Sequence, residues 1–131
     1  MGLNIYMVVV IVNDMARALD FYRLLGVEVP PDSNEQPTVG IQMGDMTFLL
    51  STRSANAVWD PVRIDPAPGD GYRMLLEFLM DDAPSVDAKY EEMIAHGYRS
   101  HAEPYDTGFG MRFAMLHDPD GNTVLLSGEI T

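Results

Sequence analysis

The chain has no cysteine among its 131 residues. This absence excludes disulfide bonds, zinc sites built on thiolates and a cysteine nucleophile. Basic residues are scarce, because 8 lysines and arginines stand against 20 aspartates and glutamates and give a formal net charge of −12 at pH 7. Proteins that bind nucleic acid carry basic patches, so we expect no nucleic-acid partner. An acidic surface suits a cationic ligand, but it also serves simply to keep a protein in solution.

Long apolar runs are missing as well. The stretch IYMVVVIV at residues 5–12 is far shorter than the ~20 residues that a membrane-spanning helix needs. The sequence shows no signal peptide, so we expect a cytoplasmic protein with no membrane partner. It also shows neither a P-loop nor the dinucleotide-binding glycine pattern. The hydrophobic fraction of 47% is typical of one globular domain.

A repeated phrase organises the sequence. TFLLST at residues 47–52 returns almost unchanged as TVLLSG at residues 123–128, 76 positions later. Each copy follows an apolar run, an acidic residue, an amphipathic helix pattern and a glycine, and Asp14 corresponds to Asp82 at an offset of 68. We interpret the chain as one duplicated unit.

Both copies carry signals for the ends of their elements. The first helix pattern begins after Asn13 or Asp14 and ends at Gly26, and the second begins after Asp81 or Asp82 and ends at Gly97. Hairpin turns are predicted at Gly44-Asp45 and at residues 118–121. We therefore predict an α+β fold with two tandem βαβββ modules in a single domain. The modules cover residues 1–52 and 72–128, and an irregular linker, residues 53–71, joins them.

The segments VNDMARALDFYRLLG and GMRFAMLHDPDGNTVLL resemble the vicinal oxygen chelate superfamily, the group of glyoxalases, bleomycin-resistance proteins and extradiol dioxygenases. The resemblance covers nearly the whole chain. It implies that the mixed sheets of the two modules curl into one cup, lined by the two repeated strands. It also implies a homodimer.

The resemblance further implies four ligand positions, usually histidine or glutamate, in the metal-dependent members. They lie on the first and last strands of each module. In this sequence they hold Met7, Leu49, Leu125 and either Met74 or Leu75. Leucine offers no donor atom, and a thioether does not suit the divalent ions of these enzymes. We therefore expect no metal and no cofactor.

The leading interpretation is metal-independent binding and sequestration of a small organic molecule, of a cationic or aromatic antibiotic type. One alternative is a lyase, isomerase or dioxygenase-like enzyme with an atypical metal site or none. A second alternative is an accessory protein that holds a biosynthetic intermediate. The predicted ligand-binding residues are Met7, Val9, Phe48, Leu50, Trp59, Leu75, Glu77, Met111, Phe113 and Leu125.

Glu77 is the one candidate for a catalytic residue, because it interrupts the apolar run MLLEFLM. In an extended strand it shares a face with Leu75. There it would pair with a cationic ligand or act as a base with a raised pKa. Alternatively it points outward and pairs with Arg73, Arg112 or an arginine of another strand.

Trp59 and the histidines leave further alternatives open. Trp59 either packs over a ligand or attaches the linker to the core. None of His96, His101 and His117 falls at a ligand position, and no two have the spacing of a helical metal site. We expect them to be structural or surface residues.

Overall fold

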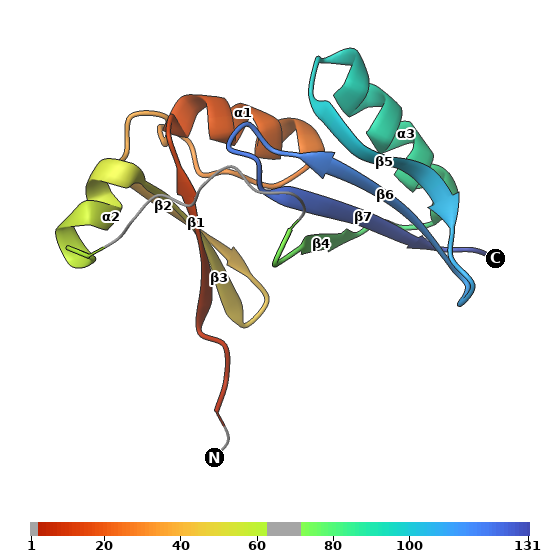
Figure 1. Cartoon of the computed structure of the whole chain (residues 1–131), viewed down its shortest axis with the longest axis horizontal. Helices are drawn as coiled ribbons and strands as arrows, with labels where there is room; N and C mark the ends of the chain where they lie inside the picture. The colour runs from red at the N-terminus through yellow and green to blue at the C-terminus, as the bar shows by residue number, and fades with distance from the viewer. Residues whose placement is uncertain (1–2, 63–71) are drawn as a thin grey trace. The chain divides into compact units, whose positions relative to one another are not determined.

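The computed structural model describes residues 3–62 and 72–131, and the chain divides into two compact units, residues 1–66 and 67–131 (Figure 1). Each unit contains a mixed β-sheet and helical segments. The predicted α+β class with two mixed sheets is confirmed. None of the helices in the described ranges is long and apolar enough to cross a lipid bilayer.

The first unit is built on a three-stranded sheet with the order β1-β3-β2. Strands β1 and β3 run parallel, whereas β2 and β3 form an antiparallel hairpin around Gly44, whose φ is 61°. Its elements are β1 (Met7–Val12), α1 (Met15–Leu25), β2 (Thr38–Met43), β3 (Met46–Thr52) and α2 (Arg53–Trp59).

The first unit differs from the prediction in two places. Only two strands follow α1, because residues 27–37 form no strand. Pro30 and Pro31 have no N–H to donate to a ladder, and the Val27 N–H is bonded to the Tyr22 carbonyl at 2.9 Å. In addition, the predicted linker is not irregular throughout, because it opens with helix α2. Thr52 ends β3 and caps this helix by accepting a bond from the Ala55 N–H at 3.3 Å.

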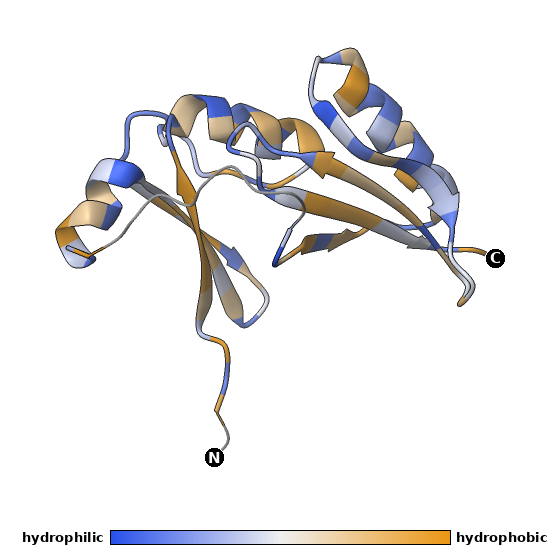
Figure 2. Cartoon of the chain, in the orientation of Figure 1, coloured by the Kyte–Doolittle hydropathy of each residue, from blue (hydrophilic) through white to orange (hydrophobic). Residues whose placement is uncertain are grey.

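The second unit has the predicted βαβββ order, with a four-stranded sheet arranged β4-β7-β6-β5. Strands β4 and β7 run parallel, and the other neighbours are antiparallel. Figure 2 shows that apolar residues follow β6 and β7 along much of their length. The elements are β4 (Leu76–Leu79), α3 (Ala83–Ala95), β5 (Arg99–Asp106), β6 (Met111–His117) and β7 (Thr123–Glu129).

Aspartates cap the two long helices. Asp14 accepts a bond from the Arg17 N–H at 3.1 Å at the start of α1. Asp82 accepts one from the Ser85 N–H at 2.9 Å at the start of α3. The Ser85 hydroxyl also donates to Asp82, and these two bonds lower the pKa of its carboxyl group. The structure thus selects Asp14 over Asn13 and Asp82 over Asp81 as the caps.

Candidate functional site

Each sheet has a face that packs on its helix, called here the helix face, and an opposite face. In the first unit the helix face includes Phe48, whose ring meets Tyr22 of α1 edge-on with the centroids 5.2 Å apart. Phe48 and Leu50 are 4% and 0% exposed. These two residues were predicted to bind ligand, but their side chains belong to the core between α1 and the sheet. The strand MTFLLST is apolar on both faces. The sequence pattern therefore could not show which of its residues face α1.

The opposite face of the first sheet carries other members of the predicted set. The parallel register pairs Met7 with Thr47 and Val9 with Leu49. A Cβ atom built on Gly40 would lie 3.5 Å from the side chains of both Leu49 and Thr47, which places all three positions on the same face. Met7, Val9 and Leu49 therefore lie together on the opposite face.

Trp59 lies at the last position of α2 and is 58% exposed. It is therefore not held in the core of the first unit. Its placement leaves the indole available for contact with another molecule.

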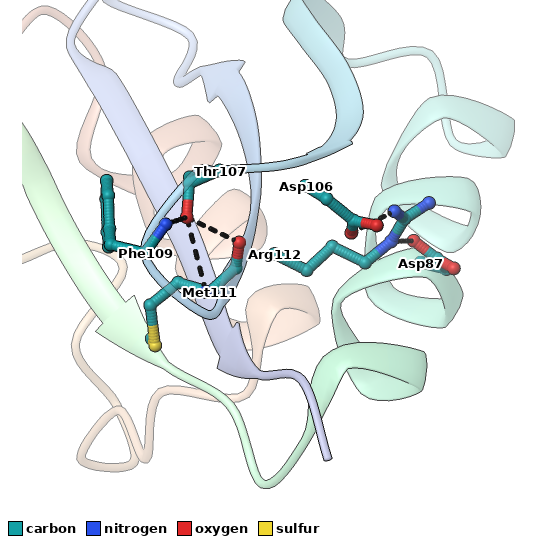
Figure 3. Close-up of polar contacts among 6 residues, drawn as sticks. All are labelled: Asp87, Asp106, Thr107, Phe109, Met111 and Arg112. Atoms are coloured by element: carbon teal, nitrogen blue, oxygen red, sulfur yellow. Dashed lines mark hydrogen bonds and ion pairs between the residues drawn. The ribbon is translucent and has the colours of Figure 1, made fainter.

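The helix face of the second sheet is marked by an ion-pair network. Arg112 of β6 donates from Nε to Asp87 of α3 at 2.6 Å and from Nη1 to Asp106 of β5 at 2.7 Å (Figure 3). Both carboxylates raise the pKa of the guanidinium. Arg112 thus joins the helix to the sheet and is not the partner of Glu77.

Glu77 lies on the opposite face of the second sheet. The sheet register places Glu77 beside Leu125, and Leu125 beside Met115. The Ser127 hydroxyl donates a hydrogen bond to Glu77 Oε2 at 2.8 Å. Ser127 itself is fully buried, whereas Glu77 is exposed. The result is a carboxylate held by one hydroxyl over an apolar surface.

The same face of the second sheet carries aromatic rings farther from Glu77. Phe113 lies beside Ser127 in the β6–β7 ladder. Its ring meets Tyr105 and Phe109 edge-on, with centroid distances of 6.1 and 5.7 Å. We call Tyr105, Phe109 and Phe113 the aromatic cluster.

Thr107 fixes the hairpin that presents this cluster. Its hydroxyl donates to the Met111 carbonyl at 2.8 Å and accepts from the Phe109 and Met111 N–H groups at 3.4 and 3.2 Å (Figure 3).

Of the predicted ligand-binding residues, Glu77, Met111, Phe113 and Leu125 share one face of the second sheet. Leu125 is only 4% exposed and mainly supports its neighbours.

Two histidines that are 16 residues apart come together on the second sheet. His101 Nδ1 lies 3.3 Å from His117 Nε2, and Tyr72 meets the His101 ring edge-on at 5.5 Å. Burial, Arg99 and His101 lower the pKa of His117, in that order of importance. This pair was not predicted from the sequence, because it depends on the β5–β6 register, which shifts between Ser100 and Ala102.

The four family ligand positions can now be placed by register. Strand β1 pairs Met7 with Thr47, and extending the β4–β7 register by one pair sets Leu75 opposite Thr123. Thr47 and Thr123 are the first residues of the two repeated phrases and therefore equivalent. Their partners, Met7 and Leu75, are then equivalent too, so Leu75, and not Met74, is the counterpart of Met7. By the same comparison Val9 corresponds to Glu77, and Ser51 corresponds to Ser127.

These positions do not suit a divalent metal ion. Met7, Leu49, Leu75 and Leu125 present no nitrogen or oxygen donor from their side chains. Within residues 3–62 and 72–131, no three His, Cys, Asp or Glu side chains gather in an arrangement that could hold a metal.

Comparison with known sequences gives a family match. A profile described as Glyoxalase/Bleomycin resistance protein/Dioxygenase superfamily matches residues 4–126. A comparison with curated proteins finds no match.

Solved structures show the same fold. A glyoxalase/bleomycin resistance protein/dioxygenase family enzyme from Burkholderia phytofirmans has a TM-score of 0.80 and 21% identity, with 95% of this chain and 97% of that chain covered. A protein of unknown function from Agrobacterium tumefaciens has a TM-score of 0.75 and 24% identity, covering 99% and 97%. A lactoylglutathione lyase from Agrobacterium tumefaciens has a TM-score of 0.68 and 21% identity, covering 97% and 94%.

Proposed function

This chain belongs to the Glyoxalase/Bleomycin resistance protein/Dioxygenase superfamily, and we propose that it binds and sequesters a small organic molecule without using a metal ion. The observation that carries this proposal is the apolar character of Met7, Leu49, Leu75 and Leu125. A Lewis-acid mechanism needs donor atoms at such positions to hold the ion. An apolar surface with few polar groups is instead typical of sites that bind organic ligands.

The surroundings of Glu77 favour a cationic ligand. The carboxylate is exposed and receives one hydrogen bond, from Ser127. An ammonium or guanidinium group would pair with the remaining lone pairs through charge-assisted hydrogen bonds. The net charge of −12 would also raise the local concentration of a cation.

The aromatic cluster favours a ligand with flat apolar parts. Phe113 lies on β6, and β7 separates it from Glu77 on β4. Glu77 pairs with Leu125 and Phe113 pairs with Ser127, two residues further along β7. With strands about 4.8 Å apart and a rise of about 3.4 Å per residue, a ligand that touches both spans about 12 Å. A cation with one or more rings meets this requirement, because its rings would pack edge-on or offset against Phe113.

An enzyme of lyase or isomerase type is the alternative. It would use Glu77 as the base and would lose turnover in a Glu77→Gln variant. An accessory protein that holds a biosynthetic intermediate would use the same surface as a sequestering protein. The two differ only in the molecule that is bound.

Two dyes of similar shape and opposite charge test the proposal. A cationic rhodamine ester and anionic fluorescein are titrated into the protein in the presence of EDTA, and binding is followed by fluorescence anisotropy. We expect the rhodamine to bind at least about tenfold more tightly, and Glu77→Gln to weaken it by about tenfold, since hydrogen bonds to charged groups contribute about 1.5–3 kcal/mol.

A matched control separates the site from the overall charge. Glu91→Gln removes the same charge from an exposed position on α3 and should leave dye binding unchanged. Loss of binding in EDTA would contradict the metal-independent mode. Equal affinity for both dyes, or an equal effect of the two substitutions, would contradict the role of Glu77.

A further inference from the structure

The pairing of His101 and His117 has a geometry suited to a metal ion. Their facing nitrogens are 3.3 Å apart. In a tetrahedral site with Zn–N bonds of about 2.05 Å, two ligand nitrogens lie about 3.3 Å from each other. The observed separation equals that of two ligands on one ion, and it also fits an N–H···N hydrogen bond between the rings.

The orientation of the rings agrees with this spacing. The ring centroids are 5.1 Å apart and the planes are inclined by 85°. An imidazole nitrogen lies about 1.15 Å from its ring centre, so two rings that point at a common ion would have centroids about 5.1–5.2 Å apart. A straight N–H···N hydrogen bond of the same length would set them about 5.6 Å apart. The observed centroid distance matches the first arrangement more closely than the second.

The neighbours of the pair also favour ligation. His117 Nδ1 lies 3.4 Å from the hydroxyl of Thr123, which is buried. If Nδ1 carries the proton and donates it to this hydroxyl, Nε2 presents its lone pair toward His101. Ligating histidines usually donate their second ring N–H to such an oxygen. The Tyr72 ring meets the His101 ring edge-on at 5.5 Å.

We propose that His101 and His117 form a two-histidine binding site for an imidazole-preferring transition-metal ion such as Zn²⁺ or Cu²⁺. Water would complete the coordination shell. The site is distinct from the four family ligand positions. His101 is exposed, so a proton on its Nδ1 can move through water to Nε2 of the same ring. The ion then takes the place of that proton, and binding needs no net loss of a proton.

Charged neighbours set the expected affinity. Arg99 lies beside His117 in the β5–β6 ladder, and its positive charge acts on that ring. This charge opposes a divalent cation. Asp118, the residue that follows His117, acts in the other direction. Arg99→Gln should therefore tighten metal binding about threefold or more, an effect that a purely structural histidine pair would not show.

Zn²⁺ titration by calorimetry tests the site on the full chain. The titration is run at about pH 7.5, where unperturbed imidazoles are neutral, and with excess Mg²⁺ to occupy surface carboxylates. We expect one Zn²⁺ per chain, with affinity reduced about tenfold or more in His101→Gln and His117→Gln and about tenfold in Thr123→Val. Electron paramagnetic resonance of bound Cu²⁺ should show coupling to two nitrogens.

His96→Gln is the matched control, because His96 caps α3 and bonds the Glu92 carbonyl at 2.9 Å, away from the pair. It should bind Zn²⁺ as the parent does. Unchanged affinity in the His101→Gln, His117→Gln double variant would overturn the proposal. Equal loss in His96→Gln would overturn it too. Circular dichroism of each variant shows that it is folded, and none of these residues takes part in the proposed dye binding.

Discussion

At the scale of single residues, Gly128 determines how α3 packs on β7. A Cβ atom at this position would collide with the backbone carbonyl of Asp82, the residue that caps α3. The contact involves two backbone segments, so a side-chain rotation does not relieve it. The close approach explains why the repeated phrase ends in glycine in the second copy but in Thr52 in the first.

We expect Gly128→Ala to lower the free energy of unfolding by about 2–3 kcal/mol, because extra atoms in a tightly packed place force the backbone apart. Urea unfolding followed by circular dichroism measures this change. Gly108→Ala is the control, since a Cβ atom there meets nothing within 4 Å. Similar stability of the two variants would mean that α3 moves freely on the sheet.

At the scale of elements, strand β3 separates a face that packs on α1 from the opposite face of the sheet. Phe48 packs on Tyr22, while Leu49 points to the opposite face beside Val9. Phe48→Ala should cost about 3–5 kcal/mol, as expected for a buried aromatic residue. Leu49→Ala should cost about 1 kcal/mol, because its side chain is only half-buried.

Urea unfolding of the two variants checks this assignment. Phe48→Ala should lower the urea midpoint strongly, and Leu49→Ala should lower it much less. A larger loss in Leu49→Ala would show that the faces of β3 are assigned the wrong way round.

The elements also show how far the sequence predicts the structure. Helices α1 and α3 follow from periodic apolar residues and from caps whose chemistry is local, such as Asp14 and Gly26. Helix α2 was missed because its cap, Thr52, is also the last residue of a strand. The third strand expected after the first helix does not form, and Pro30 and Pro31 in that segment cannot donate to a ladder.

The candidate site was harder to predict than the fold. Glu77 could be recognised because an acid in an apolar strand is conspicuous. Its partner, Ser127, is 50 residues away and depends on the β4–β7 register. The same is true of His101 and His117, which a local spacing rule does not bring together. Long-range register, which local patterns do not encode, decides these contacts.

At the scale of the whole molecule, exposed apolar residues and strong negative charge act in opposite directions. Leu79 and Phe109 of the second unit are 71% and 70% exposed. Covering these side chains by a second copy would remove apolar surface from water, which is favourable. The net charge of −12 on each chain opposes it through long-range repulsion.

We propose a homodimer whose affinity increases with salt. Sedimentation equilibrium should give twice the chain mass of 14.6 kDa at about 0.15 M salt, where the Debye length is about 8 Å. Dissociation should increase at about 0.01 M salt, where the Debye length is about 30 Å. A mass of one chain under both conditions would contradict the proposal.

The internal correspondence between the sheets leaves one buried hydroxyl without its counterpart's acid. Ser51 and Ser127 are both fully buried at matching positions. Ser127 binds Glu77, whereas the position that matches Glu77 in the first copy is Val9, which has no acceptor in its side chain. A Val9→Glu substitution would therefore place a carboxylate near Ser51 and repeat the serine–glutamate arrangement of the second sheet in the first.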